Sequence, residues 1–261
     1  MVEEMNQTVN KAIILAAGRG TRMGPYGADQ PKGMLDVMGQ PLLQHQINTL
    51  RATGIDEIII VTGYRQEAIQ FDGVRTYHNP LYAETNMVES LMCARSECNG
   101  DLLISYADIL YSAACVQQLC HDASGDVVVA VDSNWRPYWQ DRLGTTETDL
   151  ESLTVEDGRI TELGRPLTDS AGLDYRYIGL LKFTAAAWPR VFEVYDRQQA
   201  AQSAWPSSGK PFPQGYMTDL LNELIRAGVP VGISSTDRQW IELDTAEDYE
   251  WLLRRGLPFP V

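Results

Sequence analysis

Near its start the chain passes from a short apolar segment into a loop with two glycines, and this junction limits what the chain can fold into. The apolar run over residues 12–16 predicts a buried strand. Because Gly18 and Gly20 have no Cβ, the backbone N–H groups of the loop can approach a phosphate closely. Three basic residues accompany the loop, namely Arg19, Arg22 and Lys32. The junction therefore predicts a triphosphate-binding turn at the end of a strand.

Strand-like and helix-like segments alternate through the first half of the chain. Predicted strands cover residues 12–16, 57–61, 74–78, 101–106 and 126–131, and predicted helices cover residues 41–53, 86–96 and 113–122. This alternation favours a mostly parallel sheet with right-handed crossovers. Ligands of such sheets bind beyond the carboxyl ends of the strands. The glycine loop, Gly63 and Asp108 each follow a strand, so we expect them to meet at one edge of the sheet.

The second half of the chain is less regular. Two strands flank Asp157-Gly158, which predicts a hairpin. Further strands are predicted over residues 177–183, 229–234 and 240–243, helices over 185–195 and 217–227 and from Thr245, and a mobile loop over 198–215. No linker divides the chain. We therefore predict one domain over residues 1–261, with a nucleotide-binding half over about 11–132 and an acceptor-binding half over about 133–261.

The charge of the chain argues against two classes of partner. Its 261 residues include 35 acidic and 21 basic side chains, which gives a formal net charge of −14. Nucleic acids and anionic membranes bind broad basic surfaces, so neither is predicted as a partner. No apolar run approaches the ~20 residues that span a bilayer, and residues 1–6 are too acidic and polar for a signal peptide. The four cysteines lack the spacing of zinc or redox sites, so we expect free thiols in a reducing cytoplasm.

Two well-known phosphate-binding motifs do not fit the glycine loop. A dinucleotide-binding fingerprint would need a third glycine where the chain has Met23. A Walker loop would need a Gly-Lys-Ser/Thr sequence, which does not follow. A plain turn between strand and helix would need one glycine and no basic residues.

The segment from Leu15 to Met23, Leu-Ala-Ala-Gly-x-Gly-Thr-Arg-Met, together with Pro31-Lys32, resembles the signature of nucleotidyltransferases. The resemblance extends more loosely over most of the chain. It implies an α/β fold with a Rossmann-like, mostly parallel but mixed sheet flanked by helices, the GT-A-like nucleotidyltransferase fold. It also implies that the nucleotide binds at Leu15, Ala16, Ala17, Gly18, Arg19, Gly20, Thr21 and Gly63, with the backbone N–H groups of residues 17–21 holding its β- and γ-phosphates.

Transfer of a nucleotide gathers negative oxygens around one phosphorus, so catalysis is mainly positioning and electrostatic stabilisation. Arg22 is predicted beside the β- and γ-phosphates, and Lys32 is predicted to neutralise the α-phosphate and the attacking phosphate. By the same resemblance, Asp108 after the central strand and Asp244 late in the chain hold a magnesium ion, Mg²⁺. Many relatives have a second aspartate where this chain has Tyr106. Helix capping beside Thr245 is the alternative role of Asp244.

The segment from Asn79 to Ser90 narrows the resemblance to the CTP-dependent phosphocholine and aminoalkylphosphonate cytidylyltransferases. In that subfamily the residues that match Asn86 and Ser90 lie near the nucleotide. Helix capping is an equally good reading of Asn86.

Aromatic residues lie near acidic ones in the second half of the chain. Three groups are predicted to form a cage for an ammonium group: Trp135 with Trp139, Tyr216 with Asp219, and Trp240 with Glu242. A cation over such rings gains roughly 0.5–2 kcal/mol per contact. Arg142 is predicted to bind the acceptor phosphate, or else to form a surface salt bridge, and Trp188 and Trp251 are expected in the core.

The sequence therefore predicts a magnesium-dependent cytidylyltransferase. It would transfer CMP from CTP to a small phosphorylated or phosphonylated ammonium compound, phosphocholine first and 2-aminoethylphosphonate second, and release pyrophosphate. A sugar-1-phosphate nucleotidyltransferase and a catalytically silent nucleotide-binding module are the alternatives. Base preference and oligomeric state stay open, including a homodimer.

Overall fold

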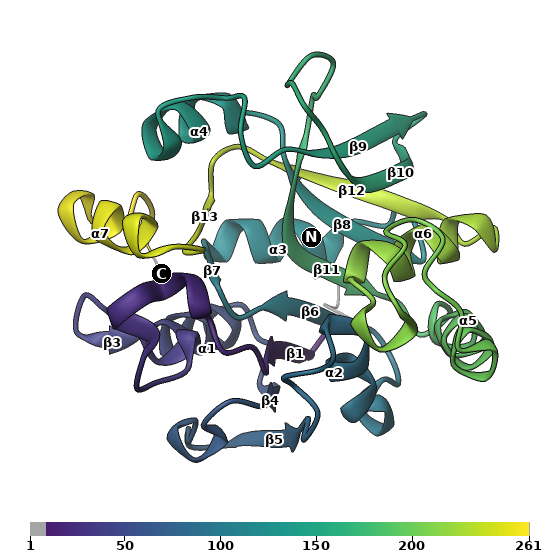
Figure 1. The fold of residues 1–261 in the computed structure, drawn as a ribbon, viewed down its shortest axis with the longest axis horizontal. Helices are drawn as coiled ribbons and strands as arrows, with labels where there is room; N and C mark the ends of the chain where they lie inside the picture. Colours follow the sequence, from purple (N-terminus) through teal and green to yellow (C-terminus); the bar gives the residue numbers. More distant parts are fainter. Residues whose placement is uncertain (1–8, 261) are drawn as a thin grey trace, which may run out of the picture.

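A nine-stranded sheet runs through the centre of the protein in the order β5-β4-β1-β6-β11-β8-β12-β10-β9 (Figure 1). The structure, a computed structural model, describes residues 9–260. The prediction that no signal peptide is present rested on residues 1–6, which lie outside the described residues. The strands of this sheet are β1 (Lys11–Ala16), β4 (Glu57–Thr62), β5 (Val74–His78), β6 (Leu102–Tyr106), β8 (Val127–Asp132), β9 (Glu151–Glu156), β10 (Arg159–Pro166), β11 (Arg176–Phe183) and β12 (Val231–Thr236).

The sheet is mostly parallel but mixed. Strands β5, β4, β1 and β6 pair in parallel, and so do β8 and β12. Strand β11 runs antiparallel to both of its neighbours, β6 and β8, and the β9–β10 hairpin adds an antiparallel edge. The central parallel strands β1, β4 and β8 are almost wholly buried, as expected where helices cover both faces of a sheet, whereas the edge strand β5 is largely exposed. The predicted fold class is confirmed.

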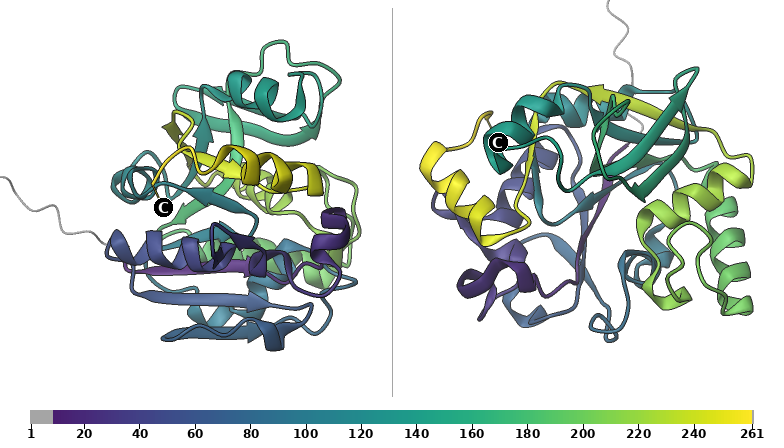
Figure 2. Two further views of the ribbon diagram at one scale, coloured as in Figure 1. Left: turned by 90° about the vertical axis from the view of Figure 1, so that its left-hand side faces the viewer. Right: turned by 45° about the horizontal axis from the view of Figure 1, so that its top comes forward.

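Helices cover both faces of the sheet. On one side lie α1 (Leu42–Ala52), α3 (Ala113–His121) and α7 (Ala246–Arg255), and on the other lie α2 (Met87–Cys93), α5 (Trp188–Ala201) and α6 (Met217–Arg226) (Figures 1 and 2). Helix α4 (Trp135–Leu143) lies at the end of the sheet that carries β9. Short 3₁₀ segments are η1 (Thr21–Gly27), η2 (Lys32–Met34), η3 (Gln66–Ala68), η4 (Arg95–Glu97) and η5 (Phe212–Gln214). None of the described helices is long and apolar enough to cross a membrane.

Two small ribbons complete the fold. Strands β2 (Asp36–Val37) and β3 (Gln40–Pro41) pair with each other, and β7 (Ile109–Tyr111) pairs antiparallel with β13 (Trp240–Glu242). Sequence patterning did not predict β7, because three residues are too few to show a period. The β7–β13 ribbon joins the two halves of the chain next to the ends of the central strands.

The segment predicted as a mobile loop is packed against the protein. Helix α5 extends into it as far as Ala201. Beyond the helix, Trp205 is fully buried, and its indole N–H donates to the carbonyl of Phe212 at 2.8 Å. Glycine, proline and serine in this segment therefore shape a folded loop around a buried tryptophan. Trp188 and Trp251 are buried, as predicted.

Candidate active site

The loop after β1 brings Lys32 against the glycines. Gly20 adopts a left-handed conformation with φ of 66°, which favours glycine. A Cβ at Gly20 would also lie only 2.9 Å from the Cβ of Lys32. Glycine is therefore required at position 20 for two reasons: the backbone turns sharply there, and the segment that carries Lys32 packs closely against it.

Lys32 forms ion pairs with the two aspartates that the sequence analysis selected. Its Nζ lies 3.0 Å from Oδ2 of Asp108 and 3.1 Å from Oδ1 of Asp244. The lysine side chain is only 12% exposed. Burial alone would lower the pKa of Lys32, but the charges of Asp108 and Asp244 outweigh it and raise the pKa. Lys32 is therefore a cation at neutral pH, and its charge is held at the end of the central strands.

The β7–β13 ribbon holds the two aspartates together. Asp108 directly precedes β7, and Asp244 follows β13 by two residues. The N–H of Leu243 donates to the carbonyl of Asp108 at 2.8 Å, which extends the ribbon. From α1, Gln46 donates to the carbonyl of Tyr106 at 2.8 Å and supports the same turn. Residues far apart in the sequence thus meet through backbone pairing.

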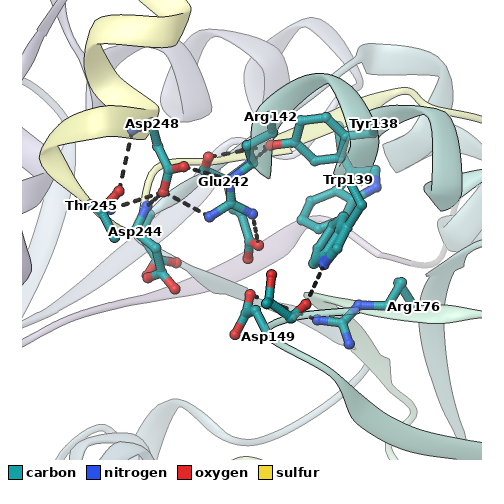
Figure 3. A network of polar contacts seen from close by, with 12 residues as sticks. Tyr138, Trp139, Arg142, Asp149, Arg176, Glu242, Asp244, Thr245 and Asp248 are labelled. Carbon is teal, nitrogen blue, oxygen red and sulfur yellow. Dashed lines mark hydrogen bonds and ion pairs between the residues drawn. The ribbon is translucent and has the colours of Figure 1, made fainter. Parts of the chain in front are cut away.

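A second network fixes the backbone at Asp244 (Figure 3). The N–H groups of Asp244 and Thr245 both donate to Oδ2 of Asp248 at 2.9 Å. Arg142 donates two hydrogen bonds to the carboxylate of Asp248, of 2.6 and 2.7 Å, and also contacts the carboxylate of Glu242. Burial alone would raise the pKa of Asp248, but the hydrogen bonds from Arg142 lower it. Asp248 is therefore a charged cap that orients the start of α7.

Asp244 does not cap α7. Thr245 is the N-cap residue, and its hydroxyl accepts from the N–H of Asp248 at 3.3 Å. The side chain of Asp244 instead faces Lys32 and Arg22, whose Nη2 lies 3.2 Å from Oδ1. The carboxylate is therefore free of a capping role and points toward the phosphate loop.

A cavity of about 250 Å³ opens over the loop and the aspartates. Twelve of the residues predicted for nucleotide, catalysis and metal line it: Leu15, Ala16, Ala17, Gly18, Gly20, Thr21, Arg22, Lys32, Asn86, Ser90, Asp108 and Asp244. Tyr82, Thr85 and Tyr106 also line it, and sequence analysis did not single them out for this site. The structure thus brings most of the predicted nucleotide residues and both predicted metal residues to one cavity.

Asn86 caps a helix, as one of its two sequence-based readings predicts, and its position is also compatible with the other. It is the N-cap of α2, where its side-chain oxygen accepts from the N–H of Met87 at 2.8 Å, and it lines the cavity. Ser90, one turn further along, accepts from the side chain of Asn79 at 3.0 Å.

Two predicted nucleotide residues lie beside the cavity rather than in its wall. A Cβ at Gly63 would lie 2.4 Å from the carbonyl oxygen of Ala17, so Gly63 lets the two loops touch. The guanidinium of Arg19 stacks on the ring of Tyr64, 5.3 Å from its centroid. Gly63 shapes the wall, and Arg19 is turned to the surface.

The predicted aromatic cage is wrong. Trp135 and Trp139 are fully buried and Trp240 is 2% exposed. The two α4 indoles pack edge to face, with centroids 5.7 Å apart. Trp240 donates its indole N–H to Asp132 at 2.9 Å. These rings form core between α4 and β13, so they present no open face to a solvent cation.

The acceptor predictions for Arg142, Glu242 and Asp219 are also wrong, because each side chain is already paired within the protein, whereas the prediction for Tyr216 stays untested. Arg142 and Glu242 contact each other, and the arginine side chain is 2% exposed, so it has no free face for a phosphate. Asp219 is 1% exposed and binds both Ser208 and the N–H of Tyr216, where it closes the start of α6. Tyr216 is partly exposed, and its ring already contacts Lys210. Proximity in sequence did not distinguish structural acids from ligand-binding ones.

The two aspartates fit a magnesium ion. Both carboxylates reach a single nitrogen atom, that of Lys32, within 3.1 Å. Magnesium in nucleotide sites uses one or two carboxylates and takes its remaining ligands from phosphates and water. Among residues 9–260, no cluster of three or more histidine, cysteine or acidic side chains forms a complete metal cage. The donor set therefore suits a metal that arrives with a nucleotide.

Known nucleotidyltransferases resemble this chain in sequence and in fold. Residues 12–231 match the family described as the MobA-like NTP transferase domain. A CTP:phosphoglutamine cytidylyltransferase from Campylobacter jejuni is 34% identical over 253 residues, which cover 92% of this chain and 97% of that protein. A choline-phosphate cytidylyltransferase from Streptococcus pneumoniae is 40% identical over 107 residues, which cover 39% of this chain and 46% of that protein.

The structural comparison agrees with the sequence comparison. A solved structure of CTP:phosphocholine cytidylyltransferase from Streptococcus pneumoniae aligns with a TM-score of 0.72 at 23% sequence identity. The alignment covers 94% of this chain and 97% of that one. At this identity the likeness shows a shared fold.

Proposed function

Since the chain belongs to the nucleotidyltransferases with a MobA-like NTP transferase domain, we propose that it transfers CMP from CTP to a small phosphorylated or phosphonylated acceptor that carries an ammonium group. The observation that supports this most is the convergence of Lys32, Asp108 and Asp244 over the glycine loop. The choice of CTP follows the names of the relatives.

In the proposed reaction an oxygen of the acceptor's phosphate or phosphonate attacks the α-phosphorus of CTP. The bond from that phosphorus to the bridging oxygen of the β-phosphate breaks, and pyrophosphate leaves. A phosphate monoester has a second pKa near ~6, so it is already ionised at neutral pH and needs no protein base. Lys32 neutralises the charge that gathers between the attacking and departing groups. Backbone N–H groups of residues 17–21 hold the β- and γ-phosphates, and Arg22 lies beside them.

Asp108 and Asp244 would hold the magnesium ion. When bound, the ion offsets the charge of the phosphate oxygens. We expect removal of divalent ions with EDTA to abolish turnover, and added magnesium chloride to restore it. Titration calorimetry of CTP should show that magnesium tightens binding to the wild type far more than to Asp108→Asn. Full turnover in EDTA would contradict this role of the two aspartates.

The cavity gives little evidence on the acceptor, because the predicted aromatic cage is not formed. The sequence-based order of acceptors, phosphocholine first and aminoethylphosphonate second, depends on that cage. The Campylobacter jejuni relative, which is matched over 92% of this chain, is instead named for phosphoglutamine, whose amino acid part also carries an ammonium group. Phosphocholine, aminoethylphosphonate and phosphoglutamine therefore all carry an ammonium group, which defines the proposed acceptor class.

The test is pyrophosphate release from a matrix of four nucleoside triphosphates against phosphorylated acceptors. The acceptors are phosphocholine, phosphoethanolamine, aminoethylphosphonate, phosphoglutamine and glucose-1-phosphate. We expect release with CTP and one or more ammonium-bearing acceptors, and release at least about a hundredfold slower from a parallel preparation of the Lys32→Ala variant. Release with glucose-1-phosphate alone would overturn the acceptor class. CTP binding without release from any pair would indicate a silent nucleotide-binding module.

A further inference from the structure

Arg176 is a buried cation with incomplete pairing. It is 7% exposed, and its Nε has no hydrogen-bond partner. Its nearest carboxylate, Oδ2 of Asp149, lies 4.0 Å from Nη2, at the outer limit of an ion pair. Burial lowers the pKa of Arg176, and the acids around it do not fully offset that shift. Because an arginine stays charged, this guanidinium lacks the second partner that its burial calls for.

The neighbouring Arg142, in contrast to Arg176, is paired with carboxylates. It makes two short hydrogen bonds to Asp248 and contacts Glu242, and these partners raise its pKa although burial alone would lower it. Arg176 instead stacks on the ring of Trp139, 4.4 Å from its centroid. Stacking fixes the plane of the guanidinium, and a planar carboxylate is the anion that matches the fork of such a group.

Asp149 has the complementary features. Its side chain is 50% exposed, so this acid meets solvent. Its backbone φ is 54°, an uncommon conformation for a residue other than glycine. Such strained positions cluster at binding sites. Figure 3 shows the guanidinium of Arg176 directed toward Asp149, within the same close-up as Asp244.

Arg176 lies at the same end of the sheet as the cavity, although neither it nor Asp149 is among the residues that line the cavity. Arg176 begins β11 and pairs with Asp132, the last residue of β8, so it lies at the end of the sheet that carries the phosphate loop. The next residue, Tyr177, donates its hydroxyl proton to the hydroxyl of Tyr106 at 2.8 Å. Tyr106 lines the cavity. The Tyr106–Tyr177 pair therefore connects the wall of the cavity to the start of β11, where Arg176 stands.

We propose that Arg176 and Asp149 form the subsite for the distal end of the acceptor, and that this end is a zwitterion whose carboxylate binds Arg176 and whose ammonium binds Asp149. An acceptor with an ammonium group alone would leave Arg176 without a partner. An acceptor with a carboxylate alone would be repelled by Asp149. The acceptor class is then a phosphorylated or phosphonylated amino acid. This inference rests on the proposed transfer of CMP and specifies its acceptor.

Two pairs of acceptors that differ only by a carboxylate provide the test. O-phosphoserine is compared with phosphoethanolamine, and 2-amino-4-phosphonobutanoate with 3-aminopropylphosphonate, each with CTP and by pyrophosphate release. A hydrogen-bonded charge pair corresponds to about tenfold to hundredfold in kcat/KM. We expect a preference of that size for the carboxylate-bearing member of at least one pair. Arg176→Met should bring the ratio of kcat/KM between the two members of the pair close to one, whatever its effect on overall turnover.

Arg136→Met is the matched control. Arg136 stacks on Trp135 at 4.5 Å, but its guanidinium already donates to the carbonyls of Leu173 and Ser170 at 2.9 Å. The acceptor preference should survive in this variant. Arg176→Lys, which keeps the charge and loses the planar fork, should retain part of the preference and covers the case in which Arg176→Met does not fold.

The outcomes separate the two proposals. Turnover of phosphoethanolamine or aminopropylphosphonate equal to that of the amino acid acceptors, unchanged by Arg176→Met, would overturn the zwitterion subsite and leave CMP transfer intact. No turnover of any ammonium-bearing acceptor by the folded wild type would overturn the transfer itself, and the subsite with it.

Discussion

Replacement of Lys32 by alanine should lower kcat by about 10²–10³-fold, the size of effect seen when one preorganised electrostatic group is removed from an active site. The same variant should weaken CTP binding by less than about tenfold. The reason is geometric. Lys32 is a buried cation held by Asp108 and Asp244 beside the phosphate loop, where charge develops during transfer. An interaction made mainly in the transition state changes kcat more than ground-state binding.

The measurement combines steady-state pyrophosphate release with titration calorimetry of CTP. Lys210→Ala is the matched control, because Lys210 lies over the ring of Tyr216 and does not line the cavity. It should keep wild-type kcat. Equal losses in kcat and in CTP affinity for Lys32→Ala would mean that Lys32 only binds the nucleotide.

Arg142→Met should lower the free energy of unfolding by about 3–5 kcal/mol, the usual cost of removing one partner from a buried ion pair. Arg142 is 2% exposed and contacts the carboxylates of Glu242 and Asp248. Without it, the buried carboxylate of Asp248 and the half-buried carboxylate of Glu242 lose this cation. Because Asp248 holds the backbone of Asp244, the folded fraction should also lose turnover. Urea unfolding, followed by circular dichroism, measures the first effect.

Arg254→Met provides the comparison for this variant. Arg254 is 68% exposed and forms only a surface pair with Glu250 at 3.8 Å. Surface ion pairs contribute at most about 1 kcal/mol, so this change should be near neutral. A loss below about 1 kcal/mol for Arg142→Met as well would show that the Arg142 network does not anchor the start of α7.

The phosphate loop and its topological partners were predictable from sequence because their signals are local. The glycines, Arg22 and Lys32 stand in one short segment, and strand-helix alternation places Asp108 at the same edge. The β7–β13 ribbon that draws Asp244 to this edge was not predictable, since its pairing joins short segments from the two halves of the chain. Asp244 was found through the resemblance rather than through this pairing.

The acceptor side shows the limit of sequence reasoning. A tryptophan near an acid in sequence reads the same whether it packs in a core or lines a cage. Trp240 finds its polar partner in Asp132, and Glu242 finds Arg142, both about a hundred residues away. No sequence motif includes Arg176 or Asp149. They became candidates only because the structure shows a buried guanidinium whose Nε lacks a hydrogen-bond partner.

The most direct test of the account is the fate of the CTP phosphates during turnover. Parallel reactions contain CTP labelled with ³²P at the α- or the γ-phosphate, the wild-type protein and an ammonium-bearing phosphorylated acceptor. The account predicts α-label in a cytidine diphosphate ester of the acceptor and γ-label in pyrophosphate, in equal amounts. Label from the γ-position in inorganic phosphate, or α-label in free CMP without an acceptor adduct, would contradict nucleotidyl transfer at this site.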